Sequence, residues 1–569
     1  MLAGQLSRYF SDYRALLPYS LLGLIAGLLS AAAVLAFEWQ IEALASLWMD
    51  EGSPDNFEGL PAWQRFLIPF SAATLLGLVF SLLKAEDRET GIVHVLSRMH
   101  SHYGQLPVRN ALVQFFGGAI SLASGMSGGR EGPGVHLGAA ISSRLAHHLQ
   151  LPNNSQRIMI ACGTAGSIAA AFNTPLAGVV FAMEVIVAEY TVVGFTPVLV
   201  AAISATTLTH ALTGDFMNLA VPDASLTSLL ELPFVLLLGV IMGAAAAAFA
   251  WLLRQALQLS TLPLWLRFTL IGLMTGTFGL FLPEVLGLGY DSLNQALLGQ
   301  IAPLALALLI AGKLFATAVT VGSGLPVGVI GPSLLIGGCL GGLLGIGGGM
   351  LMPEYSSHAS LYVVLGMAAA MAAMLNAPLA ALLAVVELTG NVSVVLPAML
   401  AIVAATLTTT VGFRARSVHQ TVLAHLRRLI PEDPISQLLH QTNVLMAMDR
   451  SVKVLNHGVG AGEPDEENMP NWCLLTRDGE PLCLMRGAEV VGLTRHLGED
   501  ERIDLLERDL RRWAITRLTA RATLREALDA MRRDDAQAVV VSDPRVSGEL
   551  GVRGVLTRDI IDQFYLTRF

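Results

Sequence analysis

The sequence predicts an all-α polytopic membrane protein followed by a smaller cytoplasmic α/β domain. Hydrophobic residues make up 53% of the 569 residues and charged residues only 14%, and the charges concentrate near the end of the chain. A mean hydropathy of +0.60 is too apolar for a soluble protein of this length. A third observation, an internal repeat, divides the apolar part into two halves.

The last quarter of the chain has the composition of a soluble domain. Residues 431–569 hold 24 of the 44 acidic and 18 of the 35 basic residues. They account for −6 of the formal charge of −9, and this acidic balance gives no indication of nucleic-acid binding. The four cysteines have no metal-ligand spacing, so neither a disulfide nor a metal site is expected.

The apolar part begins at residues 21–37, a run that reads as the first membrane helix, and no cleavable signal peptide is evident. Basic residues flank the apolar region, at Arg8 and Arg14 and again between Arg414 and Arg428. By the positive-inside rule, both termini of this multi-pass protein are expected in the cytoplasm, and we expect a bacterial inner membrane.

Apolar segments continue to residue 413, but glycine and proline interrupt many of them before they reach the ~20 residues that cross a bilayer. Broken helices are tolerated at membrane depth where their backbone lines a cavity or is buried in protein. The interruptions therefore predict a polar path through the membrane, as in transporters.

Two motifs recur in the same order in the apolar region. The pattern G-x-x-G-P-x-x-x-x-G occupies residues 129–138 and 328–337, at an offset of 199. The pattern N-x-P-L-A with a later glutamate occupies residues 173–184 and 376–387, at an offset of 203. We expect two structurally related halves with a central site where their paired breaks meet.

The first repeat copy places Glu131 in a glycine-rich loop just before a helix whose first turn holds Pro133. A helix N-terminus has unpaired N–H donors and about half a positive charge, so it can bind an anion without a fixed cation. We expect Glu131 to be a tethered plug, displaced by an anion or protonated to admit one. The alternative is a glutamate that only complements the helix dipole.

These residues carry a resemblance to a known family. G-R-E-G-P at 129–133, F-N-x-P-L-A-G at 172–178 and G-S-G-x-P-x-G-x-x-x-P at 322–332 together resemble the CLC family of chloride channels and proton–chloride antiporters. The resemblance implies an inverted repeat of broken helices. The implied transmembrane domain is 1–426, its halves are about 17–213 and 228–413, and the cytoplasmic domain is 427–569.

The resemblance also implies a homodimer in the lipid bilayer, with one chloride pathway in each subunit and no cofactor. Glu131 would be the external gating glutamate, and Ile330 would supply a backbone N–H to the central chloride. The anion-binding residues expected on this basis are Thr90, Gly91, Arg130, Gly132, Val329, Ile330, Gly331 and His419.

The sequence departs from the family pattern at three places. Where the family usually has G-S-G-x-P, residues 89–93 read E-T-G-I-V, so Thr90 keeps a hydroxyl donor but the first glycine and the proline are replaced. Val185 stands where antiporters often carry an internal glutamate, and valine cannot relay a proton. His419 replaces a pore-facing tyrosine; it can donate to an anion, or it is a solvated histidine at a helix end.

We therefore predict chloride transport gated by Glu131 with weak or absent proton coupling. A proton-coupled antiporter is the alternative, with Glu131 and Glu184 as its possible proton path. Glu184 could serve if it faces the pore, but a carboxylate at membrane depth that is repeated as Glu387 could equally have a structural partner.

An enzyme is not expected. Residues 125–128 read G-M-S-G, which matches an element of the rhomboid intramembrane proteases and makes such a protease a remote alternative. A protease would need a histidine base that reaches Ser127 from another helix. His94 and His136 are expected to be ordinary hydrogen-bonded residues.

The tail is predicted from short strand and helix patterns. Alternation over 472–476 before an Asp-Gly turn suggests strands, and the segment 458–469 is expected to be a mobile loop. Further along, an amphipathic helix is expected at 524–533, strands at 538–542 and 554–557, and a final helix from Asp559.

The tail resembles a CBS pair, with a clearer copy at 515–566 and a degenerate copy at 445–497. G-V-L-T-R-D at 554–559 is similar to that family's nucleotide contact, except that the carboxylate comes one residue early. Adenine nucleotide binding at Thr557 and Asp559 is one interpretation, and a structural or dimerising role is the other.

Overall fold

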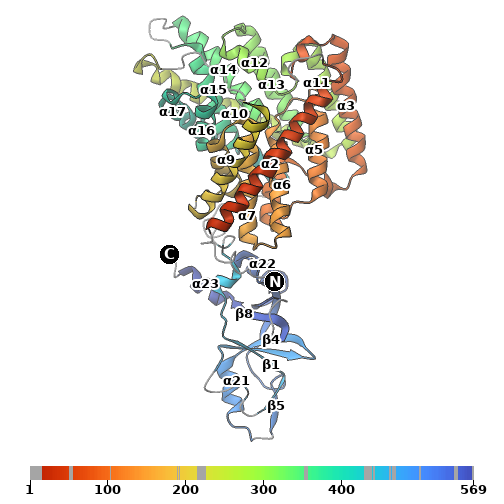
Figure 1. The fold of residues 1–569 in the computed structure, drawn as a ribbon, viewed down its shortest axis with the longest axis vertical. Helices are drawn as coiled ribbons and strands as arrows, with labels where there is room; N and C mark the ends of the chain where they lie inside the picture. Colours follow the sequence, from red (N-terminus) through yellow and green to blue (C-terminus); the bar gives the residue numbers. More distant parts are fainter. Residues whose placement is uncertain are drawn as a thin grey trace. The chain divides into compact units, whose positions relative to one another are not determined.

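The computed structural model divides into two compact units, one helical and one built around a β-sheet (Figure 1). The helical unit comprises Leu16–His148 and Arg157–Ile430, and the second unit comprises Met1–Ala15, Leu149–Gln156 and Pro431–Phe569. Arg8 and Arg14 lie outside the described residues. The structure describes residues 16–49, 55–102, 104–188, 190, 192–214, 226–351, 357–428, 439, 442–460, 463, 469–498, 501–543 and 549–566.

Eight helices in the described part of the chain are long and apolar enough to cross a membrane, as expected for a multi-pass membrane protein. The predicted first membrane helix is longer than the apolar run at 21–37, because it extends from Leu16 to Ala45. The helices are α2 (Leu16–Ala45), α3 (Ala62–Leu82), α4 (Gly91–Ser101), α5 (Val108–Ala123), α6 (Glu131–His148), α7 (Asn153–Phe172), α8 (Pro175–Phe181), α9 (Val192–Thr213), α10 (Leu232–Leu257), α11 (Leu264–Phe281), α12 (Tyr290–Leu297), α13 (Pro303–Gly322), α14 (Ile330–Leu351), α15 (Ala359–Leu375), α16 (Pro378–Thr389), α17 (Val395–Leu407) and α18 (Val418–His425). A π-helical turn, Ala182–Val187, follows α8, and another, Thr408–Gly412, follows α17.

The predicted repeat is confirmed by matching helix starts in the two halves. α6 and α14 begin 199 positions apart, and α8 and α16 begin 203 positions apart. The backbone before each matched helix also agrees, because Asn173 and Asn376 are both left-handed, with φ of 57° and 56°. Asparagine tolerates this conformation better than most residues, which accounts for its place in both copies of N-x-P.

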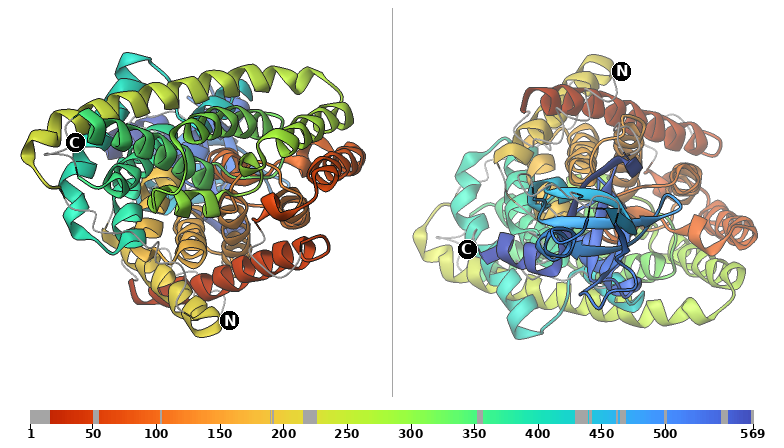
Figure 2. Two further views of the ribbon diagram at one scale, coloured as in Figure 1. Left: turned by 90° about the horizontal axis from the view of Figure 1, so that it is seen from above. Right: turned by 90° about the horizontal axis from the view of Figure 1, so that it is seen from below.

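Corresponding helices also make corresponding contacts. α2 packs along α9 in the first half, and α10 packs along α17 in the second (Figures 1 and 2). Glycine allows both approaches, because a Cβ at Gly27 would lie 2.1 Å from the Ala201 carbonyl oxygen and one at Gly239 would lie 2.5 Å from the Ala401 carbonyl oxygen. Such close backbone packing is typical of membrane helices, where small residues replace the hydrophobic driving force of water.

The second unit contains a six-stranded sheet in the order β1-β3-β4-β6-β7-β8. β1 pairs parallel with β3 and β6 parallel with β7, whereas β3–β4, β4–β6 and β7–β8 are antiparallel. The elements are α20 (Val444–Ala447), β1 (Val452–Asn456), β2 (Gly458–Gly460), β3 (Trp472–Arg477), β4 (Glu480–Arg486), α21 (Gly487–Thr494), β5 (Arg502–Asp504), β6 (Trp513–Thr519), α22 (Leu524–Arg533), β7 (Ala538–Ser542), β8 (Val552–Thr557) and α23 (Arg558–Leu566).

The predicted elements of the tail are confirmed, with two differences. The Asp-Gly turn joins β3 to β4 with positive φ at both residues, as a tight hairpin requires. The first difference concerns the alternation over 472–476, which does not give β3 one exposed face. Trp472, Cys473, Leu474 and Leu475 are all buried, because both faces of this inner strand are covered. The expected mobile loop is also wrong at its start, since Gly458–Gly460 forms β2 and pairs with β5; residues 461–462 and 464–468 lie outside the described residues.

The four cysteines are free and buried. In the tail, burial raises the pKa of the Cys473 thiol to about 12, so this thiol stays protonated and unreactive at neutral pH. Across the described ranges, no cluster of three or more His, Cys, Asp or Glu side chains has the geometry to hold a metal ion.

Candidate functional site

The two copies of the G-x-x-G-P loop touch each other at the centre of the helical unit. The Gly129 N–H donates to the Gly328 carbonyl at 2.8 Å, and the Gly328 N–H donates back to the Gly129 carbonyl at 2.7 Å. A Cβ at Gly132 would lie 2.7 Å from the Gly328 Cα, so the loops could not approach this closely with a side chain there. The contact directs the N-termini of α6 and α14 toward one region.

The Glu131 carboxylate lies between these two helix starts and is only 1% exposed. Its Oε1 accepts a hydrogen bond from the Tyr290 hydroxyl at 2.6 Å, and its Oε2 accepts the Gly331 N–H at 3.3 Å. Gly331 is in the first turn of α14, where backbone N–H groups have no partner within the helix. The carboxylate thus occupies the position at the helix terminus where an anion would bind.

The Arg130 guanidinium has partners other than the Glu131 carboxylate. It pairs with Glu38 on α2 at 3.2 Å and donates to the Ala171 carbonyl at 3.0 Å. It also lies over the Tyr290 ring, 5.6 Å from the ring centre. Because the guanidinium is engaged in this way, its contribution is to hold α6 and Tyr290 in place, and a direct role of Arg130 in anion binding stays a prediction.

Tyr290 is the first residue of α12 and was not foreseen from the sequence. The Asp55 carboxylate fixes its position by accepting the N–H groups of Leu288 at 2.7 Å, Gly289 at 2.5 Å and Tyr290 at 2.9 Å. Gly289 has a φ of 86°, a conformation that favours glycine in this turn. The G-L-G-Y sequence indicates a turn before a helix, but the contact with Glu131 depends on tertiary packing.

Five of the residues expected to bind the anion line one cavity of about 260 Å³. They are Thr90, Gly91, Gly132, Val329 and His419. The charged side chains around it are three arginines and one glutamate, so the lining attracts anions. These charged residues are Arg88, Arg267, Arg428 and Glu89. We refer to this cavity as the vestibule.

Two polar side chains of the vestibule, Thr90 and His419, can form further hydrogen bonds. Thr90 precedes α4 and makes no side-chain capping bond to the helix. His419 is 5% exposed, and its Nδ1 has no hydrogen-bond partner among the described residues. An unsatisfied buried nitrogen is costly, so a ligand or water that binds it would be stabilised.

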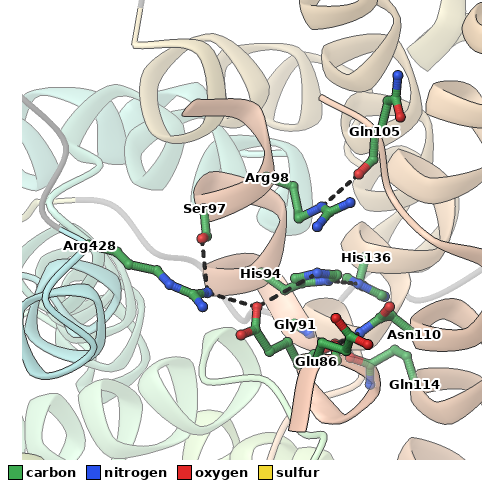
Figure 3. Close-up of polar contacts among 11 residues, drawn as sticks. Glu86, Gly91, His94, Ser97, Arg98, Gln105, Asn110, Gln114, His136 and Arg428 are labelled. Carbon is green, nitrogen blue, oxygen red and sulfur yellow. Dashed lines mark hydrogen bonds and ion pairs between the residues drawn. The ribbon is translucent and has the colours of Figure 1, made fainter. Parts of the chain in front are cut away.

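Gly91 is placed differently from expectation. Its backbone N–H donates to the Gln114 side-chain oxygen at 2.7 Å, so this donor is already used (Figure 3). Gln114 in turn donates to the Pro326 carbonyl at 2.9 Å, which ties the start of α4 to the second half of the repeat. Gly91 therefore lines the vestibule without a free N–H to offer an anion.

Ile330 and Gly331 also have distinct surroundings. The Ile330 side chain faces an apolar pocket that Phe172, Phe181 and Leu334 help to form. Gly331 donates its N–H to Glu131 and does not line the vestibule. The expected role of the Ile330 N–H as an anion donor stays a prediction.

Glu184 and Glu387 form a reciprocal pair of helix caps between the two halves of the repeat. Glu184 accepts the N–H groups of Leu379 at 3.2 Å and Ala380 at 2.9 Å, at the start of α16. Glu387 accepts the N–H groups of Leu176 at 2.9 Å and Ala177 at 2.8 Å, at the start of α8. Each glutamate therefore satisfies backbone donors at a helix terminus in the opposite half of the repeat.

Ser127 does not have the environment of a serine nucleophile. Its hydroxyl forms a 2.8 Å hydrogen bond with the Thr317 hydroxyl, and both groups are buried. A threonine cannot act as the general base that a serine protease needs. The rhomboid alternative therefore has no support from this geometry.

A buried carboxylate at a broken helix terminus, next to a cation-lined cavity in a multi-pass membrane protein, defines the class of membrane anion-transport proteins. The chain matches the family model for voltage gated chloride channels over residues 72–410. It is 35% identical over 390 residues to the "Putative chloride channel protein ClcB-like" of Ralstonia nicotianae, covering 66% of this chain and 91% of that protein. It is 30% identical over 442 residues to the "H(+)/Cl(-) exchange transporter ClcA" of Vibrio cholerae, covering 75% of this chain and 90% of that protein.

A crystal structure of a eukaryotic CLC transporter has a similar fold, with a TM-score of 0.61 and 19% identity, covering 96% of this chain and 98% of that chain. The chain belongs to the CLC family of anion-transport proteins. Members of this family are channels or transporters and not enzymes, so the protease alternative is wrong.

Replacing Tyr290 with phenylalanine is expected to increase chloride flux about fivefold, because one hydrogen bond to the Glu131 carboxylate is lost while the ring stays beneath Arg130. Chloride efflux from proteoliposomes measures this change. Tyr190→Phe is the matched control, since Tyr190 is exposed. Unchanged flux in Tyr290→Phe would show that the hydroxyl does not restrain the carboxylate.

Proposed function

We propose that this protein carries chloride across the membrane through a pathway gated by Glu131, with weak or absent coupling to protons. The assignment of the gate rests on the contacts of the Glu131 carboxylate. It accepts the Gly331 N–H at the start of α14 and the hydroxyl of Tyr290. A chloride ion competes with this carboxylate for the same donors. Protonation of Glu131 removes its charge and lets chloride take its place.

The vestibule is the proposed approach to this gate. Thr90 and His419 supply side-chain donors, and Gly132 and Val329 bring the starts of α6 and α14 to the same cavity. Of the remaining anion-binding candidates, we propose that Ile330 and Gly331 donate their backbone N–H groups to the anion. Gly91 and Arg130 are assigned only supporting roles.

The proposal of weak coupling rests on Glu184 and Val185, two residues of the π-helical turn after α8. Val185 has no titratable group. Glu184 uses both carboxylate oxygens to accept backbone N–H groups at the start of α16, and a proton bound there would weaken this cap. Both features disfavour a proton relay between Glu131 and the opposite side of the membrane.

A proton-coupled antiporter is the second candidate. The relative from Vibrio cholerae, at 30% identity, is named an H(+)/Cl(-) exchange transporter. In that case Glu131 and Glu184 would share the proton path, or His419 and water would bypass Val185.

A chloride gradient across proteoliposomes is expected to drive chloride flux without uphill proton movement, because Val185 and the helix-capping Glu184 provide no internal relay. Chloride and proton electrodes record both fluxes at once, with protein-free liposomes as the control. Val185→Glu alone is not expected to create coupling. Sustained proton pumping that is lost on neutralising Glu131 or Glu184 would favour the antiporter.

We also propose a homodimer. α8 has 7 residues and α16 has 12, so neither crosses the bilayer alone. Each exposes an apolar side chain, Leu176 and Leu379, near the glutamate caps. Short helices at membrane depth need protein around their ends, and a second copy of the chain would provide it.

We propose that the tail, residues 427–569, is a cytoplasmic domain with a regulatory or dimerising role. Both termini are also proposed to be cytoplasmic. The membrane is proposed to be a bacterial inner membrane. Thr557 is buried, and its hydroxyl accepts the Ile560 N–H at 3.4 Å, whereas Asp559 is exposed. An adenine nucleotide could reach Asp559 more readily than Thr557. Calorimetry with adenosine triphosphate tests this ligand.

A further inference from the structure

The chloride pathway proposed above does not use one buried pair of titratable groups, His94 and His136. Their rings face each other with the His94 Nδ1 2.8 Å from the His136 Nε2 (Figure 3). The ring centres are 5.1 Å apart with a 34° tilt. His94 is 3% exposed and His136 is fully buried, so this contact forms within the protein interior.

The pair joins two walls of the vestibule. His94 is in the first turn of α4, four residues after Thr90, and it lines the vestibule itself. His136 is in the second turn of α6, the helix that begins with Glu131 and Gly132. The contact therefore connects the helix that carries the Thr90 hydroxyl to the helix that carries the gate.

Other contacts hold the same segment from different sides. Asn110 on α5 donates to the backbone carbonyls of Glu86 and Glu89 at 2.7 and 2.9 Å. Arg428 pairs with the Glu89 carboxylate at 2.8 Å. α5 and the segment after α18 thus fix the loop before α4, and the histidine pair fixes α4 against α6.

The charges around the pair select a neutral arrangement of protons. The Glu89 carboxylate is 3.9 Å from the His94 Nε2, which favours an N–H at that nitrogen and leaves the His94 Nδ1 as acceptor for the His136 Nε2–H. The His136 Nδ1 is buried and has no partner among the described residues. Burial of His94 disfavours a charged ring, and the positive charges of Arg98 on α4 and of Arg428 beyond α18 also oppose an additional proton.

We propose that His94 and His136 are positioning residues of the anion pathway. Their neutral hydrogen bond sets the start of α4, with the Thr90 hydroxyl, at the distance from α6 that chloride binding requires. The proposal rests on the proposed chloride pathway and assigns no proton transfer to either ring.

The two bonded nitrogens differ in their distance from the backbone, and this difference provides the test. A glutamine amide reaches about as far as a histidine Nε2, and an asparagine amide about as far as a histidine Nδ1. His136→Gln and His94→Asn therefore keep the reach of the bonded atom. His136→Asn and His94→Gln keep the same chemistry with the wrong reach, and they are the matched controls.

Chloride binding to the purified full-length protein, measured by isothermal titration calorimetry, is the readout. The two reach-matched variants should bind within about twofold of the original protein, and the two mismatched variants should lose about tenfold in affinity. Thermal unfolding of the same samples separates positioning from a general loss of stability.

Equal affinity in all four variants would overturn the proposal, and so would an equal loss in matched and mismatched variants. Lower thermal stability with unchanged affinity in the mismatched pair would also overturn it. If the unsubstituted protein binds no chloride, the chloride pathway itself is wrong. That outcome is distinct from a failure of the histidine pair alone.

Discussion

Glu131→Gln and Glu131→Ala are expected to raise chloride flux at neutral pH and to remove most of its pH dependence. The carboxylate now accepts the Tyr290 hydroxyl and the Gly331 N–H, and both bonds are strengthened by its charge. A neutral amide loses about 1.5 kcal/mol of this interaction, which corresponds to about tenfold weaker competition with chloride. Alanine leaves the site open, so its effect should be larger.

Chloride efflux from proteoliposomes over a range of pH measures this effect. Glu42→Gln is the matched control, because Glu42 lies on α2 with an exposed side chain. We expect this control to keep the original flux and pH response. Transport by both Glu131 variants with the original rate and pH profile would refute the gate.

Glu184→Ala and Glu387→Ala are expected to destabilise the membrane unit by similar amounts, about 1–3 kcal/mol each. Each substitution leaves two backbone N–H groups unpaired at a helix start in the opposite half. Water cannot readily replace the lost acceptor at membrane depth. Glutamine should restore part of the stability, because its carbonyl oxygen can still accept one of the two hydrogen bonds.

Thermal unfolding in detergent, with proton and chloride fluxes from the same preparations, measures the result. The symmetry of the repeat provides the internal control, since Glu387 has the same contacts as Glu184 but no suggested proton role. Equal effects of the two substitutions support the capping role. A loss of proton movement in Glu184→Gln, with full stability and no such loss in Glu387→Gln, would assign Glu184 to a proton path.

Much of the fold could be predicted because its signals are local. The offset of 199 between the two glycine-rich loops predicts the starts of α6 and α14, and both helices begin within that motif. In the tail, the pattern at 524–533 predicts α22 with its observed bounds. Glycine, proline and amphipathic periodicity act through the backbone of neighbouring residues, so they are visible without knowledge of tertiary contacts.

The candidate site could be predicted only in part. The sequence predicts Glu131 as the plug, and the structure places its carboxylate at the start of α14. The sequence does not reveal that the Gly91 N–H already donates to Gln114, or that Tyr290 donates to Glu131 from a position 159 residues away. The alternatives for Glu184 stayed open as well, because only geometry shows which backbone groups its carboxylate contacts.

The sequence by itself determined the class of fold, the repeat and the identity of the central carboxylate, because these follow from composition and from spacing along the chain. Tertiary structure alone decided which groups meet: Glu131 with Tyr290, His94 with His136, and each of Glu184 and Glu387 with a helix start in the other half. The physical reason is that hydrogen bonds act over about 3 Å in space, whereas these partners are 42 to 211 residues apart in the chain.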